Sequence, residues 1–366
     1  MQGELTKVLG PFSKVSFEKY DLNSPDQLKE FLYTLGWIPD EWNYNKETKE
    51  RTSPKITLSS LESIGSSDLG KWIGRYYTLR HRRNFLQNPK DPENKGLLSF
   101  IREDGRVEAD ANTCGTPTAR MRHRPPILNV PKPTWSVPYG IELRSVFICK
   151  DPYEMWGSDL SGIEARLLGH FTYSFDGGEM ARELLAGDIH TKTAVAMGIS
   201  RNTAKTIRYA LMYGAGIGKV CTILSCSTKE AEKAIDLFYE ANPALKLLVD
   251  YLKKFYKKYK YIRAIDGRRL YIRSEHILLN SLIQGSAAVL FKDWSIRVWR
   301  MIDEIGIDAE ITIMYHDELD GRIIKGVREE MSKLLKDALK EVEVEYELKV
   351  ELETQTKFGT SWAQVH

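Results

Sequence analysis

The chain has 366 residues, of which 42% are hydrophobic and 28% charged, and its formal net charge is +3 at pH 7. This composition is typical of a folded protein of two or three domains and excludes a disordered or collagen-like chain. No stretch approaches 18 apolar residues, so we expect a soluble cytoplasmic protein without a membrane partner.

The cysteines and the charge distribution indicate which kinds of site and partner to expect. The only close cysteine pair, Cys221 and Cys226, has no second pair and no nearby histidine pair, so reduced thiols are expected rather than a zinc site or a disulfide framework. Residues 253–273 carry nine Lys or Arg and one Asp. Such a concentration of positive charge suggests a polyanionic partner.

The first part of the chain predicts few regular elements. Ser24 as N-cap and Gly36 as terminator delimit a helix. In chain order we expect a helix over 24–35, a loop over 40–60, a helix over 67–88, a hairpin over 97–111 turning at Asp104-Gly105, and an irregular segment over 113–140.

The second part is richer in periodic segments. In chain order we expect a strand ending at 155–160, a helix beginning over 163–171, helices over 188–198, 200–214, 228–240 and 243–260, a hairpin at Asp266-Gly267, a helix over 278–305, a strand over 311–315, a short strand after an Asp320-Gly321 turn, a helix over 327–341 and a strand over 344–354. Strands on both sides of a long helical block favour an α+β fold with an inserted helical subdomain.

Carboxylates follow two of the predicted strands. Asp159 closes an apolar strand and Glu164 lies in the next helix, while Asp317 and Glu318 follow the strand over 311–315. Convergent carboxylates suit Mg²⁺, and a pair of such ions can clamp the oxygens of a phosphoryl transfer. Taken singly, each motif is better explained as a helix cap or a solvated turn.

A basic helix lies between these two acidic sites in the sequence. Arg201, Lys205 and Tyr209 recur at i, i+4 and i+8 on one face, and Tyr213 continues the row. Cations for a triphosphate and a ring for a base would fit a nucleotide. A solvated basic face over buried tyrosines is an equally good explanation of this helix alone.

Together these segments resemble the three signature motifs of family A DNA polymerases, in their order, with most similarity to those of T7-like phages. The three segments are "DLSGIEARLLGHF" (159–171), "RNTAKTIRYALMYGAG" (201–216) and "YHDEL" (315–319). The resemblance extends to "TARMRHRPPILNVP" (118–131), "PYGIELRSVF" (138–147), "GDIHTKTA" (187–194), "DGRRLYIRS" (266–274), "LNSLIQGSAAVLFK" (279–292) and "KFGTSWAQVH" (357–366).

The resemblance implies a right-hand polymerase with an antiparallel-sheet palm and inserted helical fingers. It divides the chain into a partial thumb and palm entry (1–112), palm with the first motif (113–187), fingers (188–275), and palm with the third motif and C-terminus (276–366). An exonuclease domain and most of the thumb have no counterpart. We therefore expect the catalytic subunit of a split or reduced phage polymerase, in the host cytoplasm, with a separate subunit supplying exonuclease and thumb.

The resemblance also implies a metal site and its chemistry. Asp159, Asp317 and the backbone carbonyl of Leu160 would hold two Mg²⁺ ions, for which Mn²⁺ could substitute, and Glu318 would be an auxiliary catalytic carboxylate. The implied reaction is attack of a primer 3′-hydroxyl on the α-phosphate of a dNTP.

Roles for nucleotide and DNA contacts follow from the same resemblance. Glu164 would exclude the ribose hydroxyl, His190, Arg201 and Lys205 would contact the triphosphate, and Tyr209 would lie against the incoming nucleotide. For primer-template DNA the implied contacts are Arg120, Asn280 and Gln284 in the minor groove, Tyr213 near the template base, and His276 and His316 at the primer.

Three positions depart from the family pattern. Ala119 and Ala210 replace glycines that are usual there, and Arg208 is unusual on the fingers helix, where it could contact the template. Two alternatives stay open: an RNA-synthesising polymerase, against which Glu164 argues, and a catalytically weak accessory subunit that binds duplex DNA.

Overall fold

The computed structural model describes residues 10, 17, 19–21, 23–45, 47–48, 50–61, 63–64, 68–88, 96–124, 127–135, 137–187 and 189–365. The chain divides into two compact units, Met1–Gly96 and Leu97–His366. Each unit has its own cluster of buried hydrophobic side chains. No described helix has both the length and the apolar character needed to cross a membrane.

The first unit is small and mostly helical. Its elements are α1 (Pro25–Thr34), β1 (Trp42–Tyr44), β2 (Arg51–Pro54), α2 (Leu58–Leu61) and α3 (Asp68–Leu86). Ser24 caps α1 by accepting a hydrogen bond from the backbone of Gln27, as the sequence predicts. The loop predicted over 40–60 is wrong: β1 and β2 pair there, and their largely exposed residues lack the apolar alternation that would indicate strands.

The second unit contains every predicted site residue. Its first elements are η1 (Leu97–Phe100), β3 (Asp110–Asn112), β4 (Arg122–Arg124), η2 (Ile127–Asn129), α4 (Gly140–Ser145), β5 (Tyr153–Leu160), α5 (Ile163–Asp176), α6 (Glu179–Ala186), α7 (Ile189–Met197) and α8 (Arg201–Met212). The rest are α9 (Ile217–Leu224), α10 (Thr228–Glu240), α11 (Pro243–Tyr259), β6 (Tyr261–Arg263), β7 (Arg269–Tyr271), η3 (Glu275–Ile277), α12 (Leu278–Ile305), β8 (Ala309–Tyr315), β9 (Glu318–Ile324), α13 (Arg328–Glu345), β10 (Thr354–Gly359) and α14 (Trp362–Val365).

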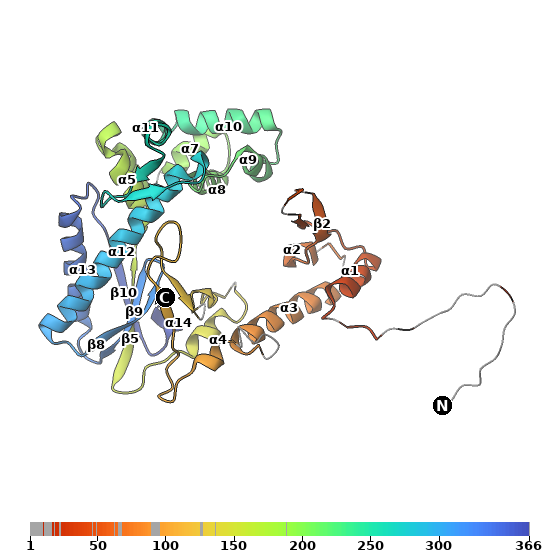
Figure 1. Cartoon of the computed structure of the whole chain (residues 1–366), viewed down its shortest axis with the longest axis horizontal. Coiled ribbons are helices and arrows are strands. Elements are labelled where there is room, and N and C mark those ends of the chain that lie inside the picture. The colour runs from red at the N-terminus through yellow and green to blue at the C-terminus, as the bar shows by residue number, and fades with distance from the viewer. Residues whose placement is uncertain are drawn as a thin grey trace. The chain divides into compact units, whose positions relative to one another are not determined.

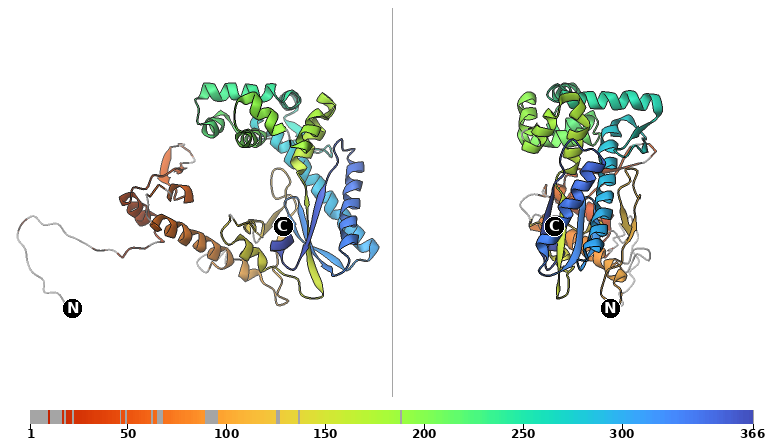
Figure 2. Two further views of the ribbon diagram at one scale, coloured as in Figure 1. Left: turned by 180° about the vertical axis from the view of Figure 1, so that it is seen from behind. Right: turned by 90° about the vertical axis from the view of Figure 1, so that its left-hand side faces the viewer.

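A four-stranded antiparallel sheet in the order β10-β5-β9-β8 is the centre of this unit, and α12 and α13 run beside it (Figures 1 and 2). Side chains alternate between the two faces of a strand. On β9, Leu319 and Ile323 join the main core with α12 and α13, whereas Glu318 and Asp320 point to the other face. That second face carries Trp362 of α14, whose indole donates to Asp320.

The helices α5 to α11 are inserted between β5 and α12, which confirms the α+β fold with a sheet and an inserted helical subdomain (Figure 1). The predicted α12 boundaries agree with the structure. The short helices α6 and α9 have no counterpart among the predicted elements. At 97–111 the turn at Asp104-Gly105 exists, but a single bridge between Ile101 and Val107 replaces the predicted hairpin.

Two predictions near the C-terminus are wrong. The strand predicted over 344–354 is not formed, because α13 continues to Glu345 with Leu339 and Val342 buried, and β10 begins only at Thr354. The turn predicted at Asp320-Gly321 lies instead at His316-Asp317, and Gly321 sits inside β9. A Cβ on Gly321 would lie 2.0 Å from the Glu310 carbonyl oxygen, so close packing requires this glycine.

Candidate active site

Two aspartates, one at the end of β5 and one in the turn between β8 and β9, meet at one end of the sheet. Asp159 is the register partner of Glu318 across β5 and β9, and the Leu160 amide donates to the Asp317 carbonyl oxygen at 3.0 Å. Asp159 is exposed, and Asp317 is partly buried in the turn between β8 and β9. The backbone pairing of the sheet therefore brings the two carboxylates predicted from the sequence to the same place.

The acidic pair is electrostatically strained. Desolvation first, and then the negative charge of Asp159, raise the pKa of Asp317 to about 6, while Arg120 acts in the opposite direction. A raised carboxyl pKa means that the ionised form is disfavoured in the folded protein without a counter-ion. The site therefore favours binding of a cation.

A buried charged cluster lies beneath this pair. Glu318 and Asp320 are both buried on the same face of β9, and Asp320 accepts from the Trp362 indole at 3.0 Å. Desolvation and Glu318 raise the pKa of Asp320 well above its usual range, and Arg144 opposes this. The Arg144 guanidinium lies 4.2 Å from the Trp362 ring centroid.

Neither Arg144 nor Asp320 is among the predicted site residues. Asp320 lies two residues after Glu318 and therefore on the same face of the strand, and this spacing is the signal that could have revealed the cluster. Glu318 is buried, whereas its register partner Asp159 is exposed.

Three predicted residues meet at Glu164. Its carboxylate accepts from Arg120 at 2.6 Å and from the Tyr213 hydroxyl at 2.7 Å. Burial, followed by the bond to Glu164, raises the pKa of the Tyr213 phenol. Glu164 thus links α5 to the end of α8 and to the segment before β4, and its position is fixed by two charge-assisted contacts.

The row predicted on α8 is exposed. Ala204, Ile207 and Met212 bury the opposite face of the helix, which leaves Arg201, Lys205 and Tyr209 toward solvent. The Tyr209 and Tyr213 rings are stacked, with centroids 6.3 Å apart.

His190 on α7 faces this row. Its ring centroid is 6.2 Å from that of Tyr209. Desolvation first, and then the charges of Arg208, Arg201 and Lys205, lower its pKa, which favours the neutral imidazole. A neutral imidazole can accept or donate a single proton beside the two exposed cations.

The expectation that Arg208 could contact the template is wrong. Its side chain is buried in the helical subdomain, where it donates to Thr193 at 2.7 Å and Asn242 at 2.6 Å. Its guanidinium lies 5.3 Å from the Phe238 ring centroid, and desolvation lowers its pKa to about 10. Arg208 is one turn from Lys205 but on the inward side of α8, which spacing alone did not reveal.

The remaining DNA-contact candidates lie in three places. His316, in the turn with φ 58, and Arg120 both lie near Asp317, and Arg120 contributes to lowering the His316 pKa. His276 is exposed. Its backbone lies next to Gly214 at the end of α8, where a Cβ on Gly214 would be 2.2 Å from the His276 carbonyl oxygen. Asn280 and Gln284 are one turn apart on the first half of α12.

Ala119 has a backbone conformation that explains why glycine is usual there. Its φ of 58° is in the left-handed region that disfavours a Cβ. Lys292 of α12 donates to its carbonyl oxygen at 2.7 Å, and Thr116 accepts from the next amide at 2.9 Å. These bonds hold the segment that presents Arg120.

Within the described residues, no group of three or more His, Cys, Asp or Glu side chains is arranged to hold a metal. Asp159 and Asp317 nevertheless fit a hard cation, since two neighbouring carboxylates provide oxygen ligands, and the raised pKa of Asp317 means that a nearby cation would stabilise its ionised form. Mg²⁺ commonly takes one or two carboxylates and completes its coordination with water and substrate phosphates.

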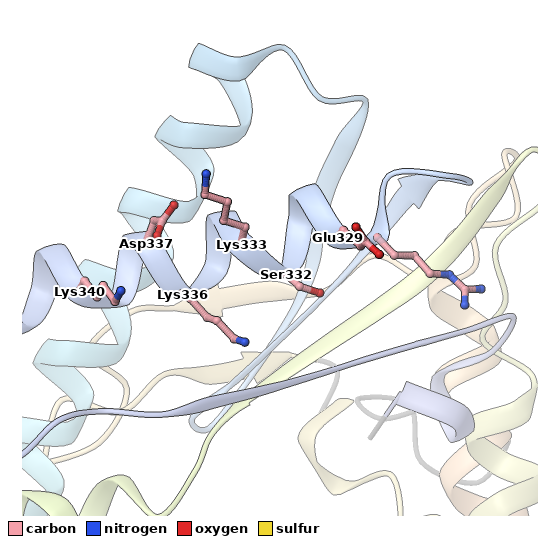
Figure 3. A pocket seen from close by; sticks show the side chains of 7 residues that line it. Glu329, Ser332, Lys333, Lys336, Asp337 and Lys340 are labelled. Carbon is pink, nitrogen blue, oxygen red and sulfur yellow. The ribbon is translucent and has the colours of Figure 1, made fainter.

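A hollow of about 470 Å³ lies elsewhere, along the exposed side of α13 (Figure 3). Its lining includes Lys333, Lys336, Asp337 and Lys340, and none of the predicted site residues. It is therefore separate from the candidate active site.

The comparisons with known proteins agree with the geometry. A sequence model of DNA polymerase family A matches residues 2–364, so the chain belongs to this family. The chain is 28% identical to the DNA-directed DNA polymerase of Escherichia phage T7, over 97% of the chain and 54% of the phage protein. It is 25% identical to the thermostable DNA polymerase I of Thermus filiformis, over 100% of the chain and 44% of that protein.

A solved structure shows the same fold. The POL domain of Pol1 from M. smegmatis, in complex with DNA primer-template and dNTP, superposes with a TM-score of 0.75 at 24% identity, covering 95% of this chain and 62% of that one. The chain spans about half the length of the curated relatives it matches.

Proposed function

We propose that the protein is a template-directed DNA polymerase that adds dNTPs to a primer 3′-hydroxyl. The observation that carries this proposal is the convergence of Asp159 and Asp317 at one end of the sheet, in the unit that also exposes the cationic row of α8. The family membership and the relatives named above support it.

Asp159, Asp317 and the Leu160 carbonyl would hold two divalent ions, Mg²⁺ or Mn²⁺. When bound, such ions lower the pKa of the attacking hydroxyl and neutralise charge on the triphosphate. Arg201 and Lys205 bind and orient the triphosphate, and neutral His190 contributes a hydrogen bond to it. Alignment of the reacting groups supplies much of the rate in phosphoryl transfer.

Glu164 selects the sugar. Arg120 and Tyr213 hold its carboxylate in place, so a ribose 2′-hydroxyl would meet a fixed side chain whose oxygens are already engaged. Tyr209 would lie against the incoming nucleotide, and Tyr213 would lie near the template base. This arrangement favours dNTPs over rNTPs and argues against the RNA-synthesising alternative.

The DNA contacts would be independent of sequence. Arg120, Asn280 and Gln284 offer donors to the acceptors that every correct base pair presents in the minor groove. His316 beside the acidic turn and His276 beside the end of α8 would contact the primer strand. Glu318 supports the reaction from its buried position.

Primer extension by the isolated chain tests this proposal. With Mg²⁺ and a primed template we expect incorporation of complementary dNTPs, no incorporation with EDTA, and strong preference for dNTPs over rNTPs. Binding of primer-template without extension under any metal condition would favour the accessory-protein alternative. Equal use of both nucleotide types would overturn the role given to Glu164.

A separate subunit that supplies exonuclease and thumb remains a prediction. Extension that stays short until a second gene product is added would support it. The cytoplasmic location likewise remains a prediction.

A further inference from the structure

A continuous line of aromatic rings covers one side of α11 and the adjoining β6–β7 hairpin; Figure 1 shows α11 in the upper part of the second unit. Ring centroids are 6.2 Å apart from Tyr251 to Phe255, 4.6 Å from Phe255 to Tyr259 and 6.0 Å from Tyr259 to Tyr261. A further 6.3 Å joins Tyr261 to Tyr271. We name these five residues, with the cations around them, the basic aromatic face.

The sequence places these rings on the surface rather than in the core. Tyr251, Phe255 and Tyr259 recur every four residues, and the buried Leu248 and Leu252 lie next to this row on α11. Tyr261 and Tyr271 are cross-strand partners. The exposed fractions of Tyr251, Tyr259 and Tyr271 are 54%, 44% and 73%, so the outer rings are open to solvent.

Cations lie close to the rings, and the three nearest have no ion-pair partner among the carboxylates that the structure describes. Arg263 and Arg269 are register partners, and their guanidinium carbons lie 5.7 and 4.8 Å from the Tyr261 ring centroid. Lys258 lies 5.0 Å from the centroid of Tyr259.

Of the nine Lys and Arg residues in 253–273, only Arg268 has an ion-pair partner among the described carboxylates, namely Asp266. Like charges directly opposite each other on paired strands are destabilising. The pair Arg263 and Arg269 is therefore unfavourable unless an anion binds there.

We propose that the basic aromatic face binds single-stranded nucleic acid, with bases stacked on the tyrosines and phosphates bound by the lysines and arginines. Aromatic rings interleaved with cations are the arrangement that binds unpaired strands without sequence preference. Duplex DNA would engage only the cations, because its bases are stacked on one another and their faces are covered. An apolar protein partner would leave the cations uncompensated.

The face lies apart from the carboxylates and the α8 row, so the binding itself does not depend on polymerase activity. This proposal rests on the proposed function in one respect only: the single strand bound here would be the unpaired part of the polymerase template. The two proposals can therefore fail separately.

Fluorescence anisotropy of the full chain in EDTA tests the proposal with two probes, a labelled oligo-dT of about 20 nucleotides and a blunt hairpin duplex. Because stacking on one ring contributes about tenfold or more in affinity, Tyr251→Ala/Tyr259→Ala should weaken oligo-dT binding at least tenfold. Binding of the blunt duplex should change less than about twofold. Trp299→Ala is the matched control, since Trp299 is 65% exposed on α12 outside this face.

A charge variant separates stacking from electrostatics. Lys254→Gln/Lys258→Gln should flatten the dependence of oligo-dT affinity on salt, with the tyrosines intact. Unchanged oligo-dT affinity in the tyrosine variant, or an equal loss for both probes, would overturn the proposal. If the chain proves unable to extend primers yet shows the selective loss, the face stands and the proposed function fails.

Discussion

The acidic end of the sheet and the basic row of α8 carry opposite charges, and they differ in how firmly the charged side chains are held. Asp159 and Asp317 are fixed by strand pairing, and Asp317 is partly buried with a pKa raised to about 6. Arg201 and Lys205 extend from one side of a helix into solvent. Ligands of a metal must be placed within a few tenths of an ångström, whereas cations that bind a flexible triphosphate tolerate more freedom.

This difference predicts that changing one carboxylate oxygen at the acidic end abolishes activity. A single substitution in the α8 row should instead reduce nucleotide affinity only in part. Substitutions on the two sides should therefore separate the rate of the reaction from the affinity for nucleotide. The predictions below test that separation, beginning with the largest effect.

Asp317→Asn keeps the shape of the side chain and removes a charged ligand. We expect the extension rate to fall by about 10³-fold or more, with primer-template affinity changed less than about twofold. Single-turnover extension together with a binding assay measures both. A variant that extends at the wild-type rate would contradict the metal-ligand assignment.

Glu164→Ala opens the space beside the sugar and releases Arg120 and Tyr213. Discrimination against rNTPs should fall by about 10²-fold, because the rejecting contact is lost. Tyr213→Phe removes one of the two bonds that hold Glu164 and should have a smaller effect in the same direction. Competition between dNTP and rNTP on one primed template gives the ratio.

Lys205→Met retains the aliphatic stem but removes the charge on the α8 row. We expect KM for dNTP to rise by about tenfold, with less effect on kcat, since a charge-assisted contact to phosphate is lost. Lys333→Met, on the exposed side of α13, is the matched control and should leave KM unchanged. If Lys205→Met lowered kcat and left KM unchanged, the assignment of the α8 row to nucleotide binding would be contradicted.

The raised pKa of Asp317 predicts a pH-dependent stability difference in EDTA. A folded pKa of about 6 against an ordinary value of 3.8 means that the folded state binds the extra proton, so stability is lost as pH rises through this interval. Asp317→Asn lacks this loss. Its free energy of unfolding should exceed the wild-type value by on the order of 3 kcal/mol at pH 7 and by almost nothing at pH 3.5.

Thermal unfolding at several pH values measures this difference. Glu310, whose pKa is lowered by Arg322, produces the opposite slope, but it is present in both proteins and cancels. A difference that does not change with pH would show that Asp317 is not strained by its surroundings.

The sequence by itself determined the parts that depend on local pattern. Helix periodicity and capping act over a few residues, so they can be predicted from the sequence. This holds for the bounds of α12, the cap of α1, and the shared face of Arg201, Lys205 and Tyr209. The ordered motifs likewise identified the family and the carboxylates, which are chemical signatures carried by residue type and spacing.

Only the tertiary structure decided what depends on neighbours distant in the sequence. Arg208 faces Thr193 and Asn242 rather than solvent, and position 321 within β9 requires glycine because the Glu310 backbone leaves no room for a side chain. The same holds for the buried group of Glu318, Asp320 and Arg144, and for the bonds that fix Glu164. Burial and long-range contact arise from how the elements pack, and no local pattern encodes them.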